Sequence, residues 1–301
     1  MSNAPTVAAG FVGGLGVEAP GAAGPLVFGI RFSALDAAGL VAVLAGPVAP
    51  GSGVRLVATA NLDHVVQLRR NARFRRAYAG AFAATADGAP VALYARLRGV
   101  RIPGRVAGVD LFERLMAALR PGVHRPFFLV GHEATGAGLR AWLEARGFAA
   151  EAVATFCPPF GFERDEAGSA RLARAIRAHG TTHLVLGVGA PKSEIWVDSW
   201  RGELGDCCAL AVGAGLDFFL GRLSRAPLWM QRLGLEWLWR LGLEPRRLWR
   251  RYAVDAWSFP LAVVADLSGG WPGTGRDGPG RDGSDRDGLD RDGLDRDGAG
   301  R

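Results

Sequence analysis

The sequence predicts an α/β fold: a mainly parallel, Rossmann-like sheet with helices on both faces, followed by a C-terminal helical appendage that is basic and aromatic. Two patterns support this prediction. Between residues 26 and 220, short and nearly continuous apolar runs alternate with longer amphipathic runs, as expected where strands are buried on both faces. From residue 221 on, tryptophan and arginine are mixed within one segment, which predicts helices of a different kind.

Six apolar runs are predicted as strands because glycine, proline or polar residues bound them. They are residues 55–59, 81–86, 127–130, 152–156, 184–188 and 209–212. The amphipathic runs between them predict helices, which are residues 62–72, 89–97, 110–119, 134–145, 165–179 and 194–202. Ligands of such sheets bind beyond the carboxyl ends of the strands. The residues that follow each strand are therefore the first candidates for a functional site.

The two ends of the chain do not favour a packed core. Residues 1–25 are rich in Ala, Gly and Pro and predict a flexible leader, and residues 269–301 repeat Arg-Asp-Gly and predict a disordered tail. The triplet at residues 285–287 resembles a metal-binding Asp-x-Asp motif, but we attribute it to the repeat. The expected organisation is a leader (1–25), an α/β domain (26–220), an appendage (221–268) and a tail (269–301).

The start of the appendage, residues 221–252, contains four tryptophans and eight arginines but only two acids. Pro245 should divide this segment into two helices. In the second helix, Arg246 and Arg250 are four residues apart and lie on one face. Such a cluster could bind a diphosphate through forked hydrogen bonds, or it could be a solvated basic face. Aromatic and basic residues together are also typical of helices on anionic membrane surfaces.

The chain of 301 residues has a formal net charge of +7, which predicts an acidic partner: nucleic acid, anionic lipid or a phosphate-rich substrate. A GC-rich coding sequence would also favour arginine. Three cysteines without paired spacing suggest neither a disulfide framework nor a zinc site and fit a reducing compartment. The sequence has no signal peptide and no apolar run long enough to cross a membrane. We therefore expect a cytoplasmic protein, peripheral on the inner face of the cell membrane.

Several classes of site are not supported. No G-x-G-x-x-G opens a helix after the first strand, and no P-loop is present. The five histidines show no ligand spacing. We expect no bound metal and no cofactor.

Three residues at predicted strand ends could carry chemistry. Asp87 follows the second strand, where a carboxylate suits a general base or the cap of the next helix. Asn61 follows the first strand and could bind a sugar or orient the base, although its position alone favours a cap. Lys192, the only lysine, follows the fifth strand and could contact a phosphate or pair with Glu194.

Taken together and in order, the motifs of residues 27–252 resemble the WecG/TagA/CpsF glycosyltransferases. The motifs are residues 59–61 (Thr-Ala-Asn), 87–88 (Asp-Gly), 105–110 (Arg-Val-Ala-Gly-Val-Asp), 128–131 (Phe-Leu-Val-Gly), 187–194 (Gly-Val-Gly-Ala-Pro-Lys-Ser-Glu), 212–218 (Val-Gly-Ala-Gly-Leu-Asp-Phe), 225–227 (Arg-Ala-Pro), 235–241 (Leu-Glu-Trp-Leu-Trp-Arg-Leu) and 244–247 (Glu-Pro-Arg-Arg). Any one motif is weak, but the ordered set is specific.

The resemblance implies transfer of a sugar, by default N-acetylmannosamine, from a UDP-sugar to a polyprenyl-diphosphate-linked sugar in surface polysaccharide biosynthesis. It implies inversion of the anomeric centre without a metal. It further implies that Asp87 is the base, that Asn61 acts beside it, and that Arg240, Arg247 and Arg250 belong to an appendage that closes the site and aids membrane association. The expected substrate-binding residues are Thr59, Gly88, Gly131, Gly189, Pro191, Lys192, Ser193, Glu194 and Gly213.

One departure from the family pattern concerns the sugar. The family commonly has Pro-Lys-Gln-Glu where residues 191–194 read Pro-Lys-Ser-Glu. Ser193 is too short for the same amide contacts, so either the sugar differs or a water fills the gap, and UDP-glucose or a uronic acid stays open as donor. The expected partners are the UDP-sugar, the lipid-linked acceptor and an anionic membrane surface, without nucleic acid. A homo-oligomer remains open.

Other functions are weighed against this one. A nucleic-acid-binding protein would fit the net charge and the Arg/Trp content, but no known nucleic-acid module is visible. A non-catalytic, membrane-associated scaffold could keep the same fold, although the presence of Asp87 and Asn61 argues against it. An NAD-dependent sugar-nucleotide oxidoreductase lacks its glycine fingerprint.

Overall fold

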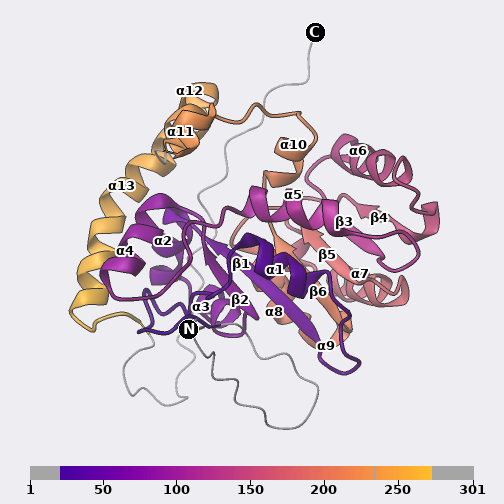
Figure 1. Ribbon diagram of the computed structural model, residues 1–301, viewed down its shortest axis with the longest axis horizontal. Helices are drawn as coiled ribbons and strands as arrows, with labels where there is room; N and C mark the ends of the chain where they lie inside the picture. Colours follow the sequence, from indigo (N-terminus) through magenta and orange to yellow (C-terminus); the bar gives the residue numbers. More distant parts are fainter. Residues whose placement is uncertain (1–20, 233–234, 273–301) are drawn as a thin grey trace, which may run out of the picture.

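The computed structural model describes residues 21–232 and 235–272 and confirms the predicted fold class. Six parallel strands form one sheet in the order β2-β1-β6-β5-β3-β4, with helices packed around it (Figure 1). The strands are β1 (Val54–Ala60), β2 (Ala83–Ala86), β3 (Pro126–Leu129), β4 (Ala154–Phe156), β5 (His183–Leu186) and β6 (Cys207–Ala211). Each one overlaps a predicted strand.

The sheet is covered on both faces because alternate residues of its strands join different cores. Val57, Phe128 and Leu210 pack in one core with α1 (Ala37–Leu44), α5 (Gly108–Ala118) and α6 (Glu133–Glu144). Leu56 and Leu129, their neighbours in sequence, pack in another with α7 (Glu166–Ala178) and α8 (Lys192–Ser199). Both faces are thus apolar, which explains why the inner strands read as continuous apolar runs.

The remaining helices of the α/β domain are α2 (Leu62–Arg70), α3 (Ala72–Ala79), α4 (Ala89–Leu97), α9 (Arg201–Leu204) and α10 (Gly215–Phe219), with 3-10 turns η1 (Ala150–Ala152) and η2 (Phe162–Arg164). The predicted helix 62–72 is wrong at its end. Asn71 breaks it, because its side chain accepts a hydrogen bond from the N–H of Phe74 (3.0 Å) and so caps α3. Helix α1 was not predicted, because its sequence AAGLVAVL has no polar residue to reveal a helical period.

Both ends of the described chain pack on the α/β domain. Ala22, within the predicted leader, donates its N–H to the carbonyl oxygen of Phe32 (2.7 Å). Trp271, within the predicted tail, is buried against the ring of Phe28. The rest of the predicted leader (1–20) and tail (273–301), including the triplet at residues 285–287, lies outside the described residues.

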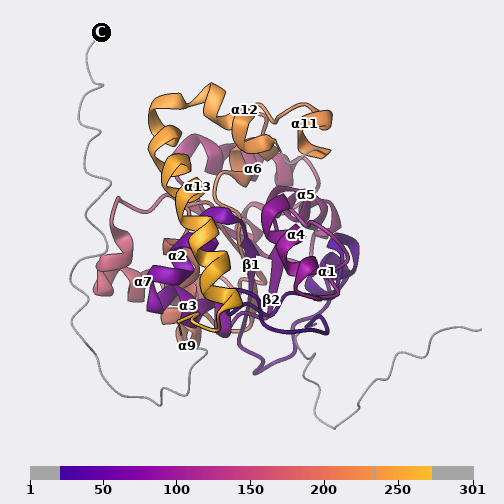
Figure 2. The same cartoon turned by 90° about the vertical axis from the view of Figure 1, so that its left-hand side faces the viewer.

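The appendage contains α11 (Leu228–Arg232), α12 (Glu236–Leu243) and α13 (Pro245–Leu267). Pro245 begins α13, as predicted for a residue that cannot continue a helix. Helix α13 packs against α2 along the side of the domain (Figure 2). In the described part of the chain, no helix combines the length and apolar content needed to span a bilayer.

The far end of α13 is fixed to the domain by one buried carboxylate. Asp266 accepts hydrogen bonds from the N–H of Phe28 (2.7 Å) and the hydroxyl of Tyr94 (2.9 Å), and it pairs with Arg98. The appendage is therefore anchored at this end, whereas residues of α12 lie near Asn61 and Asp87, which follow β1 and β2.

Candidate active site

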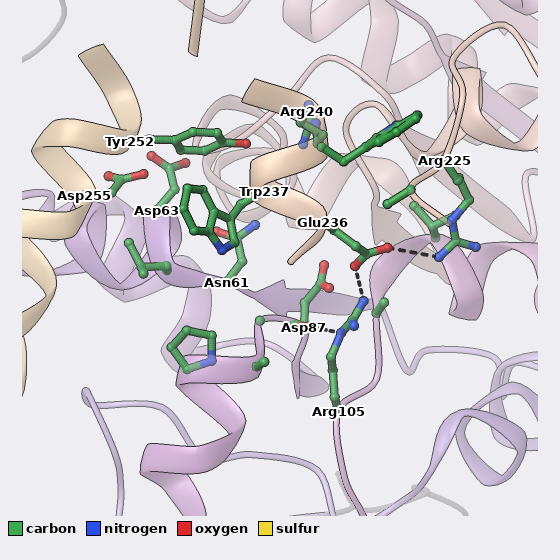
Figure 3. Close-up of a pocket in the computed structure, with 18 of the residues that line it drawn as sticks. Asn61, Asp63, Asp87, Arg105, Arg225, Glu236, Trp237, Arg240, Tyr252 and Asp255 are labelled. Atoms are coloured by element: carbon green, nitrogen blue, oxygen red, sulfur yellow. Dashed lines mark hydrogen bonds and ion pairs between the residues drawn. The ribbon is translucent and has the colours of Figure 1, made fainter. Parts of the chain in front are cut away.

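A cavity of about 430 Å³ lies where β1 and β2 end and where the appendage covers the sheet. Asn61 and Asp87 form part of its floor, because each follows one of these strands directly. Trp237 and Arg240 of α12 and Tyr252 of α13 form part of its roof (Figure 3). The α/β domain and the appendage thus line the same cavity.

Asp87 lines the cavity and does not cap the helix that follows it. Gly88, not Asp87, occupies the N-cap position of α4, and no side chain caps that helix, so the capping interpretation of Asp87 is wrong. Its Oδ2 instead accepts a hydrogen bond from the N–H of Gly108 (3.3 Å), at the start of α5. Burial raises the pKa of Asp87 to about 6, against the opposing effects of this hydrogen bond and of Arg105. The carboxylate is thus ionised at neutral pH but more basic than usual, as general-base catalysis favours.

Asn61 both caps a helix and lines the cavity. Its Oδ1 accepts a hydrogen bond from the N–H of His64 (3.1 Å), which caps α2. The cap orients the side-chain amide, and its nitrogen is left as a donor without a protein partner among the described residues. The two interpretations of Asn61 are therefore compatible.

Arg105 joins the floor of the cavity to its roof. Its Nε donates to the backbone carbonyl of Asp87 (2.7 Å), and its Nη2 pairs with Glu236 of α12 (Figure 3). Glu236 also lies 3.5 Å from Nη2 of Arg225, which in turn pairs with Asp110 at 2.9 Å. Glu236 thus links two arginines, Arg105 of the α/β domain and Arg225 of the appendage, in a charged network beside the candidate base.

Sequence analysis missed Arg105, Arg225 and Glu236 as site residues. None of them follows a strand, so the strand-end rule could not select them. The available signal was their position within three of the family motifs, at residues 105–110, 225–227 and 235–241.

The predicted arginines of the appendage occupy different places. Arg240 lines the cavity, and its guanidinium lies 5.8 Å from the ring centroid of Phe218. Arg250 is exposed on α13 beside the ring of Trp249 and does not line the cavity. The side chain of Arg247 lies outside the described residues.

The predicted substrate-binding residues fall into two groups. Gly88 lines the cavity, and Thr59 is buried in β1, against the position that a side chain at Gly108 would take. Gly131, Gly189 and Gly213 lie instead beyond the carboxyl ends of β3, β5 and β6 and do not line the cavity. Lys192 and Pro191 lie with this second group, at the start of α8.

Ser193 and Glu194 are buried at the start of α8. The hydroxyl of Ser193 donates to the carbonyl oxygen of Gly189 (3.0 Å), so it binds the loop that precedes the helix. Burial, and the nearby charge of Asp63, raise the pKa of Glu194 to about 7. Its Oε2 has no hydrogen-bond partner among the residues that the structure describes.

Among residues 21–232 and 235–272, no three His, Cys, Asp or Glu side chains are grouped as ligands for a metal ion. The charged groups of the cavity are acids and arginines, a set that can accept a proton and stabilise phosphate charge.

The region that forms this cavity matches the sequence model of a known family. The sequence model of the "Glycosyl transferase WecG/TagA/CpsF family" matches residues 26–271, a region that contains the sheet, the cavity and all three helices of the appendage. The chain therefore belongs to the WecG/TagA/CpsF family of glycosyltransferases, which act in the biosynthesis of cell-surface polysaccharides.

Proposed function

We propose that this glycosyltransferase moves a sugar from a UDP-sugar to a polyprenyl-diphosphate-linked sugar, with inversion at the anomeric carbon and without a metal. The observation that carries the proposal is the position of Asp87. Its carboxyl group has a raised pKa and faces a cavity roofed by an arginine-bearing helix. A base and cationic groups in one enclosed space are what a displacement at a sugar phosphate requires.

The reaction is a single displacement. The acceptor hydroxyl oxygen attacks the anomeric carbon while the carboxylate of Asp87 takes its proton. The bond between that carbon and the phosphate oxygen breaks, and its electron pair leaves with the diphosphate. Asn61 donates its amide N–H to the sugar or the acceptor and so orients the two reactants.

Arginines stabilise the charge that develops on the departing diphosphate. Arg105, Arg225 and Arg240 all line the cavity, and removal of one such donor typically raises the barrier by roughly 3 kcal/mol. Arg250 is exposed outside the cavity, and we assign it, with Arg247, to the diphosphate of the lipid-linked acceptor. Ser193 uses its hydroxyl within the protein, which leaves the sugar specificity to other contacts, and N-acetylmannosamine remains the default donor sugar.

The appendage also brings the protein to its lipid-linked substrate. The outward face of α13 carries Trp257, Leu261 and Val264, all exposed, while Asp255 and Ser258 face the domain. An apolar face turned to the solvent, with basic residues at the start of the helix, suits insertion into an anionic membrane surface. We therefore propose a peripheral protein on the inner face of the membrane.

The test is a transfer assay. The protein is incubated with each of several UDP-sugars and a short-chain lipid-diphosphate-sugar acceptor, with EDTA present, and the lipid is analysed by mass spectrometry. We expect a mass gain with one donor, and no gain with the Asp87→Asn variant, which should still bind UDP. Transfer that stops on EDTA treatment would contradict the metal-free step. Binding of neither UDP nor any UDP-sugar would favour a scaffold with the same fold.

A further inference from the structure

The candidate active-site cavity has two chemically different ends, which lie on opposite sides of Trp237 (Figure 3). The lining of one end, which we call the arginine end, includes three cations: Arg105, Arg225 and Arg240. The lining of the other, which we call the acid end, includes the carboxylates of Asp63 and Asp255 beside the ring of Tyr252. A diphosphate is attracted to the arginine end and repelled from the acid end.

The two carboxylates of the acid end come from different parts of the chain. Asp63 belongs to the first turn of α2, and Asp255 belongs to α13, which packs against α2. The amide nitrogen of Gln67 donates to Oδ2 of Asp63 (2.8 Å) and so orients that carboxylate. Asp255 is only 5% exposed, although it lines the cavity. An ionised carboxylate offers about four acceptor positions, so its contacts within the protein leave room for the hydroxyl groups of a ligand.

Aromatic rings form the wall beside these carboxylates. Trp237 of α12 and Tyr252 of α13 pack edge to face, with ring centroids 6.1 Å apart and planes at 86°. A pyranose ring has an apolar face, which can lie on an aromatic ring, and a rim of hydroxyl groups, which donate charge-assisted hydrogen bonds to carboxylates. Apolar walls with a few placed polar groups are typical of ligand sites. The acid end thus has the chemistry of a sugar subsite.

The geometry of the displacement decides which sugar this subsite receives. When the anomeric centre is inverted, the acceptor oxygen and the leaving group are on opposite faces of the donor sugar. The leaving diphosphate is attracted to the arginine end, and Asp87 lies between Trp237 and Arg105 in Figure 3. The acceptor sugar therefore approaches from the acid end. Repulsion also keeps the acceptor's own diphosphate out of this end, in agreement with its assignment to Arg250 outside the cavity.

We propose that Asp63 and Asp255 determine the acceptor specificity: they bind an uncharged sugar through its hydroxyl groups and exclude a hexuronic acid. A carboxylate on the acceptor sugar would lie against two like charges in a partly enclosed site, which disfavours the wrong ligand. The inference rests on the proposed function, because the acceptor is its second substrate. Neither residue belongs to any of the family motifs found in the sequence.

The experiment measures acceptor binding without the donor. Isothermal titration calorimetry compares two water-soluble analogues, an alkyl diphosphate that carries a hexose and one that carries the matching hexuronic acid. The full chain should bind the hexose analogue at least tenfold more tightly. Asp63→Asn and Asp255→Asn should each narrow this ratio several-fold, because asparagine keeps the size and one acceptor oxygen but not the charge. Trp237→Ala should weaken both analogues by a similar factor and leave the ratio unchanged.

The matched control is Glu144→Gln, which removes the same charge from an exposed position at the end of α6, outside the cavity. It should keep the affinity ratio of the wild type. Melting temperatures show whether each variant is folded. Because Asp63 is only half-buried, Asp63→Asn tests the proposal even if Asp255→Asn does not fold.

The outcomes separate this inference from the proposed function. Equal affinity of the wild type for the two analogues, or an unchanged ratio in folded Asp63→Asn, would overturn the specificity assignment. If the wild type binds the hexose analogue selectively but no UDP-sugar supports transfer, the proposed donor is wrong and the acid end stands as the acceptor subsite. If the wild type binds neither analogue, the acid-end assignment and the proposed acceptor are both wrong.

Discussion

Arg105 holds the backbone of the candidate base: its Nε donates a 2.7 Å hydrogen bond to the carbonyl oxygen of Asp87. The same guanidinium pairs with Glu236 on α12. One side chain thus joins the strand end that carries the base to the helix that covers it. The position of the appendage and the environment of the base are therefore coupled, and a change in the roof should be measurable at Asp87.

Glu236→Gln should shift the pH dependence of transfer. Glu236 raises the pKa of Asp87, and Arg105 lowers it. Removal of the carboxylate takes away the first effect and frees Arg105 to act on Asp87 more strongly. The acidic limb of the kcat/KM profile should therefore move to lower pH, and kcat/KM at pH 8 should fall several-fold as α12 loses its partner. The measurement is kcat/KM between pH 4.5 and 8.5.

The matched control for this variant is Glu113→Gln. Glu113 pairs with Arg225 at 3.4 Å but neither lines the cavity nor affects the pKa of Asp87. The acidic limb of the kcat/KM profile of Glu113→Gln should coincide with that of the wild type. If the acidic limb of the kcat/KM profile were the same for Glu236→Gln and the wild type, the position of α12 and the pKa of Asp87 would not be coupled.

Asp87→Asn should abolish transfer and stabilise the protein at high pH. The pKa of Asp87 is raised from 3.8 to about 6, so the folded state binds this proton more tightly than the unfolded state. Ionisation above that range therefore costs stability, on the order of 1–3 kcal/mol for a shift of this size. The variant should unfold at a higher temperature than the wild type at pH 8, and at the same temperature at pH 3.5.

For the wild type, kcat/KM should fall as the pH drops through about 6.

The sequence was a good guide to the sheet and to half of the site. Strands buried on both faces are nearly continuous apolar runs, so they are visible without a structure, and the residues that follow them can be read directly. Asp87 and Asn61 were found in this way. Arg105 and Glu236 were not, since each depends on the fold to bring the loop before α5 against the appendage.

Other expectations could not be decided without side-chain positions. Arg240 and Arg250 are ten residues apart in one basic segment, yet only Arg240 lines the cavity, because the break at Pro245 turns the chain between them. The hydroxyl of Ser193 donates to the carbonyl oxygen of Gly189 inside the protein, a contact that its position in the sequence did not reveal. A motif locates such residues without showing which way they point.

Asp266→Ala should detach the far end of α13 from the domain. Asp266 is buried and accepts from the N–H of Phe28 and the hydroxyl of Tyr94, and it pairs with Arg98. Its removal leaves two buried donors and a partly buried cation without their partner, which typically costs about 3–5 kcal/mol. Urea unfolding should show a loss of this size. Asp198→Ala breaks pairs with two arginines that solvent reaches, Arg76 (65% exposed) and Arg201 (35% exposed), and should cost less. Equal losses in the two variants would contradict the anchoring role.

Glu194→Gln should stabilise the protein in a pH-dependent way. The pKa of Glu194 is raised from 4.5 to about 7, mainly by burial, and one of its oxygens has no partner. The folded state thus holds the proton more tightly than the unfolded state, and stability is lost as the pH rises from about 4.5 through 7. At pH 9 the glutamine variant should have a higher melting temperature than the wild type, and its free energy of unfolding should be larger by up to about 3 kcal/mol. At pH 4 the two proteins should be equally stable. Glu203→Gln, on an exposed position of α9, should show no such difference.

The outward face of α13 has the opposite polarity to that of an ordinary surface helix. Trp257 is 78% exposed and Val264 is 61% exposed, whereas Asp255, Ser258 and Asp266 on the other face are buried. Exposed apolar side chains in a row gain free energy only when something apolar covers them, at about 25 cal/mol per Å² of buried area. The basic residues at the start of α13 favour an anionic lipid surface as that cover.

Trp257→Ser combined with Val264→Ser should therefore weaken binding to anionic vesicles about tenfold or more, as measured by vesicle co-sedimentation. The loss of two exposed apolar side chains should leave the melting temperature unchanged and transfer to a water-soluble acceptor analogue intact. Val123→Ser, at an exposed position before β3, should bind vesicles like the wild type. High salt should release the wild type only in part, because screening weakens the arginine contacts and not the inserted apolar side chains. If high salt released all of the wild type, or if the double variant bound vesicles as well as the wild type, membrane binding would depend on the charge of the arginines alone.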